Sequence, residues 1–558
     1  MNLYMTRLSR IALLGFIATL LTACDTSEKA LPQTGPAPGY TGVVLNTSSD
    51  PRLAFDGNGN AIAVWSQFDG TRKNIWARRY TAASGWNTPQ LIETNGGDAD
   101  FPRLVFDGRG NAVVIWRHIE VVQATIEILD NPNTPIDETK FPPHCEAAKV
   151  ATGSILVNRY DAIKQQWIGV QQIETDNSIV VVERVKDDGV VECRLKGHDA
   201  YNPVIAADAN GDFMAVWEQY FDNDPYNNTP PSRSIRVNRY DAVAAQWQGS
   251  GLIPGLTAND PGDANAPQIA GDGKGNFTVV WRSLAYDRSA ANQYNSAQNR
   301  RYNLWGNRYA AGSGWGAAAL VSDNTVLLVN GVPDLTNPII SGNADTPHIA
   351  MDAAGNALAV WVQSNHLFTN RYDVTLNQWV PAPQRVDPDP NWTAAAPQIA
   401  MNAAGDAILV WEQYFDVDPH DGTPAWKNIR ASRYNAATRL WGAPQLIETN
   451  DTGHALAPQI AMDALGNAMA VWQQWDDTQK QYSVWANRYD TLLGWELALL
   501  IEDIGSGDAL SPHVAVDGTG NVTAVWAQHD NKAVRNRIYA NRYTIGGGWG
   551  EAGLLEAH

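Results

Sequence analysis

The sequence "PRLAFDGNGNAIAVW", from Pro51 to Trp65, returns in a close variant, "PRLVFDGRGNAVVIW", from Pro102 to Trp116. The same frame, a proline followed fourteen residues later by a tryptophan, occurs eight times in the 558 residues. The remaining copies are Pro203/Trp217, Pro267/Trp281, Pro347/Trp361, Pro397/Trp411, Pro458/Trp472 and Pro512/Trp526. A fixed internal repeat indicates one fold built from equivalent units that share an extended core.

A second signature follows each copy, first as "NIWARRY" ending at Tyr80 and later as "SVWANRY" ending at Tyr489. Its Arg-Tyr pair is present in all eight repeats, and another tryptophan follows six or seven residues after each tyrosine. Sixteen of the 22 tryptophans are therefore repeat positions. Large aromatic residues at fixed strand positions favour core packing, with sugar-stacking platforms as the alternative.

Each repeat reads as four β-strands. In "PQIAMDALGNAMAVWQQW", two apolar runs flank a Gly466-Asn467 turn, as expected for a hairpin. The glycine supplies a positive φ, and the Asp463 carboxylate can accept backbone N–H groups across the turn. "SVWANRY" is the third strand, and "GWELALLIE" from Gly494 is the fourth. Eight antiparallel four-stranded units without helical periodicity predict an all-β, eight-bladed β-propeller over residues 41–558. A solenoid is the rival, but its end repeats usually differ from the middle ones.

The Asp-x-x-Gly-Asn turn, preceded by a proline and an apolar strand, resembles the hairpin of NHL-type propeller repeats. The resemblance covers this hairpin alone, because NHL repeats lack the tryptophan and the "NRY" strand. It implies the propeller fold and no particular activity.

Loop lengths distinguish the two faces of the predicted ring. The spacing from the proline to the first tryptophan is the same in all eight repeats. The spacing from the first tryptophan to the tyrosine varies from eleven residues (Trp361 to Tyr372) to forty-four (Trp116 to Tyr160). The distance from second tryptophan to the next proline also varies, from sixteen to thirty-six residues. Because antiparallel strands alternate in direction, loops 2–3 and 4–1 emerge on one face, here called the variable face. The opposite, constant face carries the short turns. Loops vary where function is built, so we expect binding on the variable face.

Repeats three and six share a long loop almost verbatim, "WEQYFDNDPYNNTP" from Trp217 and "WEQYFDVDPHDGTP" from Trp411. These twin loops are the strongest candidates for partner contacts. Their candidate contact residues are Glu218, Gln219, Asp222, Asp224, Glu412, Gln413, Asp416 and Asp418. Asp416, Asp418 and Asp421 are also spaced as in a calcium loop, although without a full EF-hand pattern, and a solvated acidic loop is the simpler interpretation.

The N-terminus, "MNLYMTRLSRIALLGFIATLLTAC", has two arginines, a short apolar run and small residues before Cys24. "LTAC" resembles a bacterial lipobox, which implies a signal peptide over 1–23 and diacylglycerol and palmitate on Cys24. Asp25 next to this cysteine resembles an inner-membrane retention signal. Residues 24–40 are rich in Pro and Gly and predict a flexible tether. We therefore expect a lipid-anchored protein of the bacterial cell envelope, on the periplasmic side of the inner membrane or on the outer membrane.

The net charge limits the classes of binding partner, and the cysteine content suggests one disulfide. The formal net charge of −19 disfavours nucleic acid and anionic headgroups, so membrane contact should come from the lipid alone. Cys145 and Cys193 lie in two insertions expected on the same face, and an exported protein can keep them oxidised as a disulfide.

No catalytic or metal motif emerges from the sequence: GxSxG, CxxC and HExxH are all absent. Glu218 and Glu412 could supply a glycosidase carboxylate pair, but spacing alone does not give their separation. The repeat arginines and the turn aspartates are expected to pair within each repeat as structural ion pairs, with eight equivalent anion sites as the alternative. The sequence thus favours a protein-binding or assembly module. It indicates no cofactor other than the calcium ion that the acidic loop could hold. A glycan-binding or glycan-cleaving propeller is the alternative; a quinoprotein is disfavoured because its "TGxxxW" turn is absent.

Overall fold

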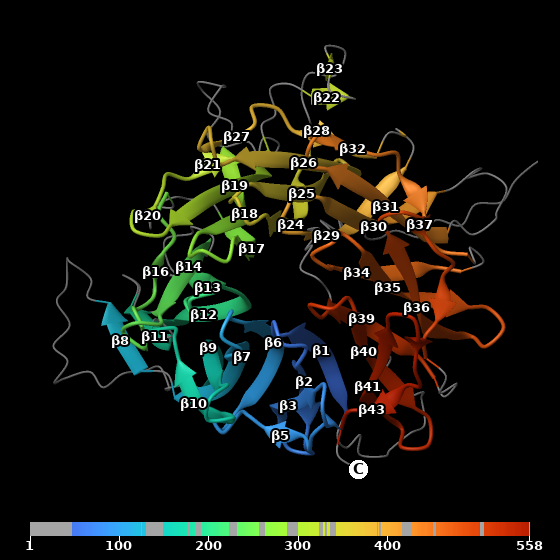
Figure 1. The fold of residues 1–558 in the computed structure, drawn as a ribbon. Helices are drawn as coiled ribbons and strands as arrows, with labels where there is room; N and C mark the ends of the chain where they lie inside the picture. The colour runs from blue at the N-terminus through green and yellow to red at the C-terminus, as the bar shows by residue number, and fades with distance from the viewer. Residues whose placement is uncertain are drawn as a thin grey trace, which may run out of the picture. The chain divides into compact units, whose positions relative to one another are not determined.

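The computed structural model describes residues 47–123, 125–129, 149–175, 179–185, 191–221, 232–255, 263–286, 300–322, 327–329, 332–334, 342–387, 389, 392–415, 426–449, 453–502 and 507–556. These residues form an all-β, eight-bladed propeller, which confirms the predicted fold (Figure 1). Within this described part no helix is long and apolar enough to cross a membrane. The predicted leader, Cys24, the tether and Cys145 lie outside it.

The four main strands of each blade come from a single repeat, so blade number equals repeat number. The first strands are β1 (Ser48–Phe55), β6 (Asp98–Phe106), β12 (Val191–Ala207), β17 (Ala264–Gly271), β24 (Ala344–Met351), β29 (Thr393–Met401), β34 (Ala455–Met462) and β39 (Ala509–Val516). The second strands are β2 (Ala61–Phe68), β7 (Ala112–Gln123), β13 (Phe213–Phe221), β18 (Phe277–Tyr286), β25 (Ala357–Gln363), β30 (Ala407–Phe415), β35 (Ala468–Asp476) and β40 (Val522–Asp530). The third strands are β3 (Lys73–Thr81), β9 (Lys149–Asp161), β14 (Ser232–Asp241), β19 (Arg300–Ala310), β26 (His366–Asp373), β31 (Trp426–Asn435), β36 (Gln481–Asp490) and β41 (Arg535–Thr544).

The fourth strand consists of two short pieces in seven blades and of one bulged strand, β10 (Gln166–Gln172), in blade 2. The pieces are β4 (Gly85–Trp86) with β5 (Gln90–Leu91), β15 (Gln246–Trp247) with β16 (Gly251–Leu252), β20 (Gly314–Trp315) with β21 (Ala319–Leu320), β27 (Gln378–Trp379) with β28 (Gln384–Arg385), β32 (Leu440–Trp441) with β33 (Gln445–Leu446), β37 (Gly494–Trp495) with β38 (Leu499–Leu500) and β42 (Gly548–Trp549) with β43 (Gly553–Leu554). Insertions add β8 (Thr125–Leu129) and β11 (Ile179–Val185) to blade 3, and β22 (Leu327–Val329) and β23 (Val332–Asp334) to blade 5.

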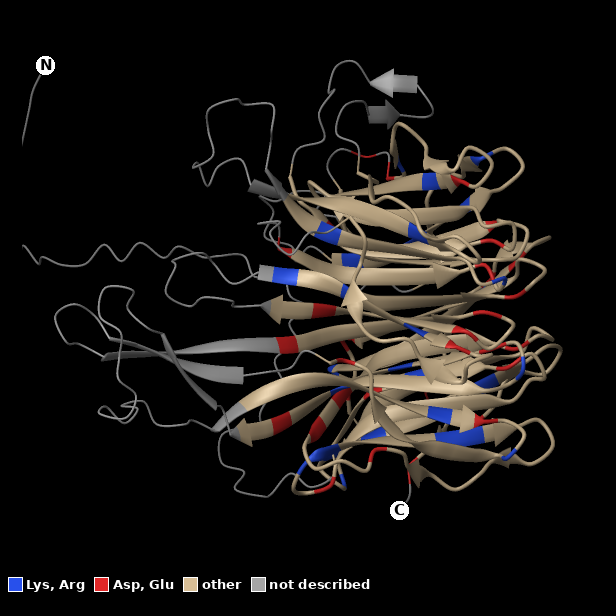
Figure 2. Ribbon diagram, turned by 90° about the vertical axis from the view of Figure 1, so that its left-hand side faces the viewer, with Lys and Arg blue, Asp and Glu red and all other residues tan. Residues whose placement is uncertain are grey.

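The hairpin turn forms as predicted. In blade 7 the Asp463 Oδ1 accepts the backbone N–H groups of Leu465 and Asn467, both at 2.9 Å. Its Oδ2 accepts from the Asn467 side chain at 2.8 Å, and Gly466 takes a φ of 91°. The aspartate thus closes the turn on the constant face, where Figure 2 shows the short turns gathered on one side.

The tryptophans form the core. The first tryptophan of every repeat is fully buried between neighbouring blades. The second packs against the repeat tyrosine in all eight blades, with ring centroids 5.3–5.7 Å apart, as for Tyr489 and Trp495 at 5.4 Å. Tilted and edge-to-face pairs of this kind add to the burial of apolar area. The predicted packing role of the sixteen tryptophans is therefore confirmed.

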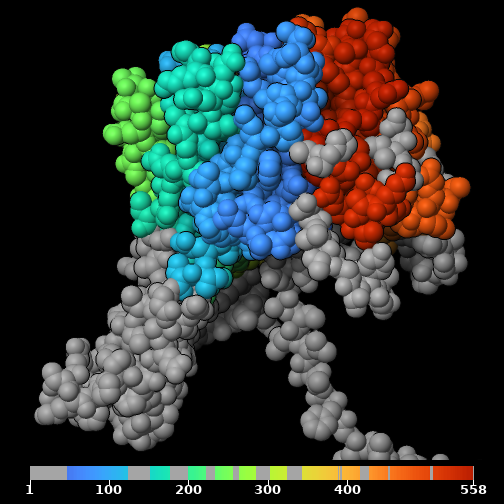
Figure 3. Space-filling model, turned by 90° about the horizontal axis from the view of Figure 1, so that it is seen from below, coloured from blue at the N-terminus to red at the C-terminus, as the bar shows by residue number. Residues whose placement is uncertain are grey.

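Blade 1 (blue) and blade 8 (red) lie side by side where the ring closes (Figure 3). Among the described residues, the sheets of these two blades share no strand. The first strands are innermost, since each contacts its neighbours around the ring, including β1 with β39. Leu53 and Trp65 of blade 1 share a core cluster with Val525 and Ile538 of blade 8. Arg78 also donates hydrogen bonds across this junction to two backbone carbonyls of blade 8, each at 3.0 Å.

Candidate functional site

The second strands change character at the core tryptophan. Residues before it are buried and, apart from Thr278 and Thr523, apolar, whereas the residue two positions after it is glutamine in six blades. In each of these six, the glutamine Oε1 accepts the indole N–H, as in Trp526 to Gln528 at 2.9 Å. Blades 2 and 4 carry His118 and Ser283 instead. The variable-face half of the propeller is therefore lined by a buried polar layer.

The first strands carry a β-bulge at the same level. The residue before each repeat proline has a positive φ in all eight blades. The register between the first and second strands shifts at this residue in every blade. At three junctions, the side chain directly after the core tryptophan of one blade accepts the backbone N–H at the bulge of the next blade. Glu218 accepts from Ala266 at 2.8 Å, and Glu412 accepts from Ala457 at 2.9 Å. Gln473 does the same for blade 8.

Two of these junctions build equivalent sites, three blades apart, on the variable face. Site A, between blades 3 and 4, consists of Glu218, Tyr220, Arg233, Asp263 and Tyr302. Site B, between blades 6 and 7, consists of Glu412, Tyr414, Lys427, His454 and Tyr482. The two sets occupy the same register positions, since Tyr220 pairs with Arg233 and Tyr414 pairs with Lys427 across the strands.

Site B has a simple hydrogen-bonding geometry. The Lys427 ammonium lies 2.8 Å from the Glu412 carboxylate, and its backbone N–H donates to His454 Nδ1 at 3.3 Å. Burial lowers the pKa of His454, and the charge of Lys427 adds to this effect. The Tyr414 ring is 39% exposed, so the site presents one accessible aromatic ring beside fixed polar groups.

Aromatic rings surround this polar core. Trp426 packs edge-to-face on His454 with centroids 5.1 Å apart, and Trp475 packs in the same way on Tyr482 at 5.3 Å. The indole N–H of Trp475 donates to Asp477 at 3.0 Å. Site B is therefore an aromatic cluster with a carboxylate, an ammonium and an imidazole among its rings.

Site A is more highly charged. The Arg233 guanidinium forms a bidentate pair with Asp263, with both N–O distances 2.8 Å, and lies 3.6 Å from Glu218. The Tyr302 hydroxyl donates at 2.6 Å to Asp263 Oδ2, which also accepts from Arg233 Nη2. Although burial alone would raise the pKa of Asp263, hydrogen bonds from Arg233 and Tyr302 lower it. Burial and the hydrogen bond to Asp263 raise the pKa of Tyr302 to about 12, so this hydroxyl stays a donor at neutral pH.

The structure separates the predicted contact residues into two groups. Glu218, Gln219, Glu412 and Gln413 are buried, with at most 7% exposed, and they hold strand ends and indole groups in place. The groups nearer to solvent are the tyrosines and cations beside them, which the sequence pattern did not single out. Asp222, Asp224, Asp416, Asp418 and Asp421 lie outside the described residues. Within the described ranges no three potential metal ligands gather, so the calcium site and the disulfide of Cys193 with Cys145 stay predictions.

The repeat arginines mainly connect blades. The arginines of blades 1 and 8 stack over the tyrosine of the next repeat's Arg-Tyr pair, Arg79 on Tyr160 at 5.4 Å and Arg542 on Tyr80 at 4.8 Å across the ring closure. The same contact recurs from blades 2, 3 and 4. The expected pairing with the turn aspartate of the same repeat is present for Arg542 with Asp517, at 2.8 Å. In blade 6, where asparagine replaces the turn aspartate, Arg433 instead pairs with Asp406, the last residue of that turn.

A third charged group lies between blades 2 and 3. The Arg117 guanidinium stacks on the Tyr201 ring at 4.2 Å and lies 3.7 Å from Asp199. Asp100 is the cross-strand partner of Arg117. Burial raises the pKa of Asp100 to about 6, the charge of Asp50 adds to this effect, and Arg117 opposes it. A carboxyl with this pKa can exchange a proton near neutral pH, as a general acid must.

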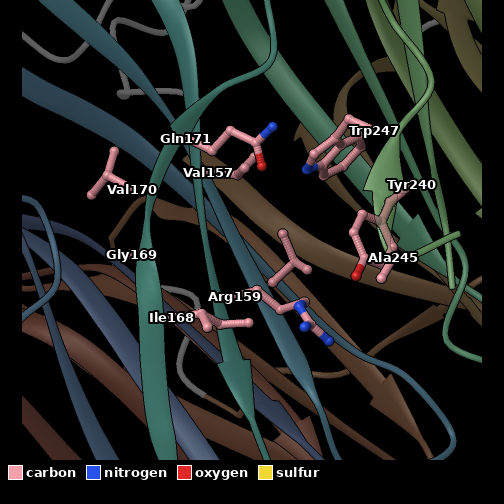
Figure 4. A pocket seen from close by; sticks show the side chains of 10 residues that line it. Val157, Arg159, Ile168, Gly169, Val170, Gln171, Tyr240, Ala245 and Trp247 are labelled. Carbon is pink, nitrogen blue, oxygen red and sulfur yellow. The ribbon is translucent and has the colours of Figure 1, made fainter.

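A pocket of about 380 Å³ lies elsewhere, between blades 2 and 3 next to β10 (Figure 4). Val157, Ile168 and Trp247 line it together with Arg159 and Gln171. Arg159 belongs to the arginine–tyrosine ladder, since it stacks on Tyr240 at 5.4 Å. The pocket is therefore lined in part by the structural contact between Arg159 and Tyr240. It contains no residue of site A or site B.

No family model matches this sequence, and no curated protein matches it. Among solved structures, the chain is similar to an α-L-arabinanase of Penicillium chrysogenum complexed with arabinobiose, at 11% identity and a TM-score of 0.38, over 71% of this chain and 98% of that one. It is also similar to an α-L-arabinofuranosidase of Fusarium graminearum, at 12% identity and a TM-score of 0.36, over 72% and 99%. A leech intramolecular trans-sialidase is similar at 13% identity and a TM-score of 0.34, over 90% and 69%. These neighbours act on glycans, but likeness at this level does not assign a ligand to this chain.

Proposed function

We propose that the protein binds a glycan through sites A and B on its variable face. The observation that carries the proposal is the recurrence of one constellation, a carboxylate, a cation and two tyrosines, at two junctions three blades apart. Two equivalent sites on one rigid face suit a ligand that itself repeats, because binding the second unit becomes intramolecular. A polysaccharide has such repeating units.

The chemistry of the sites supports a hydroxyl-rich ligand. Sugar rings stack on aromatic faces, and their hydroxyl groups pair with side chains that both donate and accept hydrogen bonds. In site B the Glu412 and Lys427 side chains already hold each other at 2.8 Å, so little rotamer entropy is lost when a ligand binds. The side-chain charges cancel in site B and leave one net negative charge in site A, which disfavours an anionic ligand at either site.

A protein partner is less well supported by the exposed surface. Protein interfaces usually centre on an apolar patch. Among the described residues, the large exposed aliphatic side chains mostly lie on the turns of the constant face, such as Ile163, Val243 and Leu465, or on the outer fourth strands, such as Leu499. The described part of the variable face instead combines exposed or half-buried rings with charged groups.

Binding to an array of neutral oligosaccharides tests the proposal. Tyr414→Ala and Tyr220→Ala should each weaken binding to long oligosaccharides, and the double variant should abolish it, because each removes an aromatic ring from one site. Loss of a stacking ring should cost about 1–3 kcal/mol per site, by analogy with base stacking on aromatic side chains. Leu465→Ala, at a position 79% exposed on the constant face, is the matched control. Unchanged binding in the double variant would refute the assignment.

A glycan-cleaving role is the second candidate, and Asp100 is the observation that favours it. Its pKa of about 6, raised by burial and further by the charge of Asp50, suits the proton donor of a glycoside hydrolase. Asp100→Asn should abolish hydrolysis of any glycan that the array identifies while leaving its binding unchanged. Hydrolysis at wild-type rate in this variant would exclude Asp100 as the acid.

A further inference from the structure

The innermost strands place one residue of each blade at a common level around the axis, the residue after the repeat proline. Each of these residues pairs across the hairpin with the residue just before the core tryptophan, as Arg52 does with Val64 and His348 with Val360. We call these eight positions the axial ring. Its members are arginine in blades 1 and 2, histidine in blades 5 and 8, glutamine in blades 4, 6 and 7, and valine in blade 3.

The axial ring is basic in a chain whose net charge is −19. Arg52, Arg103, His348 and His513 are its ionisable members, and no carboxylate occupies any of the eight positions. All four are partly exposed, although their strands form the innermost layer of the propeller. These basic side chains make the potential near the axis positive, although the molecule as a whole is negatively charged.

Contacts across blades show that these side chains lie along the inner wall. His513 of blade 8 accepts the backbone N–H of Leu53 in blade 1 through its Nδ1, at 3.3 Å. Arg52 and Arg103 each fold back along their own strand, with an Nη1 atom 3.2 Å from the carbonyl oxygen of the preceding proline. The charge of Arg103 in blade 2 also helps to lower the pKa of His348, three blades away, after the larger effect of burial. The His513 contact with blade 1 and the influence of Arg103 on His348 thus place these side chains in one basic region along the inner wall.

We propose that the axial ring binds an oxyanion, namely a sulfate, phosphate or carboxylate group, at the centre of the propeller. Two guanidinium groups supply charge-assisted hydrogen bonds, and the glutamine amides and neutral imidazoles supply further donors. Three carboxylates lie close to ring members along the same strands, and the nearest of them, Asp50, two residues before Arg52, accepts the Ser49 hydroxyl at 2.9 Å. Asp345 pairs with Arg282 at 2.9 Å, and Asp100 faces Arg117. This inference does not depend on glycan binding at sites A and B.

Calorimetric titration of the whole protein with inorganic sulfate, inorganic phosphate and acetate, at constant ionic strength, tests the proposal. Arg52→Gln and Arg103→Gln should each reduce affinity for the preferred anion at least about tenfold, because one of the two guanidinium charges that bind it is lost. Both variants should fold, since glutamine is the native residue at the same position in three blades. Arg109→Gln, which removes the same charge from an exposed turn on the constant face, is the matched control.

The three anions separate the possible sources of the bound group. Preference for sulfate or phosphate indicates a tetrahedral oxyanion, and preference for acetate indicates a carboxylate. Equal anion binding in wild type, Arg103→Gln and Arg109→Gln would show that anions act on the general surface, and it would overturn the proposal. So would the absence of measurable binding of all three anions to the wild-type protein.

Discussion

The hydrogen bond between core tryptophan and glutamine makes a quantitative prediction in blade 8. Gln528 is fully buried, accepts the indole N–H of Trp526 at 2.9 Å and donates to the carbonyl of Gly507 at 2.6 Å. Gln528→Met keeps the length of the side chain and removes both bonds. The buried indole N–H then lacks a partner, which costs about 1–3 kcal/mol, and the carbonyl loses a bond worth about 1 kcal/mol.

We therefore expect Gln528→Met to destabilise blade 8 by about 2–3 kcal/mol, after part of the loss is offset by the apolar side chain. Backbone hydrogen exchange in β40 and β41 reports this opening directly, and exchange there should accelerate roughly 30- to 140-fold. Gln90→Met, at an exposed position of β5, is the control and should change exchange very little. Equal exchange rates in the two variants would refute the view that this hydrogen bond stabilises the blade.

Further predictions concern the ring closure, the axial ring and the cysteines. Arg542→Ala, at the junction of blades 8 and 1, should destabilise by about 1–3 kcal/mol and should raise hydrogen exchange in β1 and β41 before other strands, because it removes a stacked cation and an ion pair. The pKa of His348 is about 4 in the folded protein, below its ordinary value of 6.5, so the unfolded state binds more protons between these values and stability falls as pH falls through this window. His348→Gln should flatten that decline in urea denaturation midpoints, and an unchanged pH profile would contradict the assignment. Cys24→Ser should move the protein from the membrane fraction to the soluble fraction without unfolding it, and mapping of non-reduced peptides should recover Cys145 linked to Cys193.

The repeat frame predicted the architecture because its constant spacings follow from strand and turn lengths that cannot vary within a blade. Asp463 and Gly466 fit their turn as expected, since a tight turn limits both the backbone conformation and its hydrogen-bond partners. The tryptophan packing followed from the same argument. Local pattern and local structure agree in these elements.

Contacts between blades could not be predicted in the same way. Arg79 stacks on Tyr160, in the next repeat, and a spacing within one repeat cannot indicate that partner. The equivalent sites are likewise assembled from two blades each. The twin loops follow two equivalent strand ends, and their role in binding stays a prediction. Glu218 and Glu412 at the start of these loops are buried and support the bulges of the following blades. The recurrence of glutamine two residues after the core tryptophan was the sequence signal for this buried polar layer.

The number of glycan sites per chain tests the central claim most directly. Calorimetric titration with a short oligosaccharide that fills one site should give two equivalent sites in the wild-type protein, because site A and site B share one register and one set of interactions. The same titration should give one site in Tyr414→Ala and one in Tyr220→Ala. A wild-type stoichiometry of one that neither substitution changes would contradict the account.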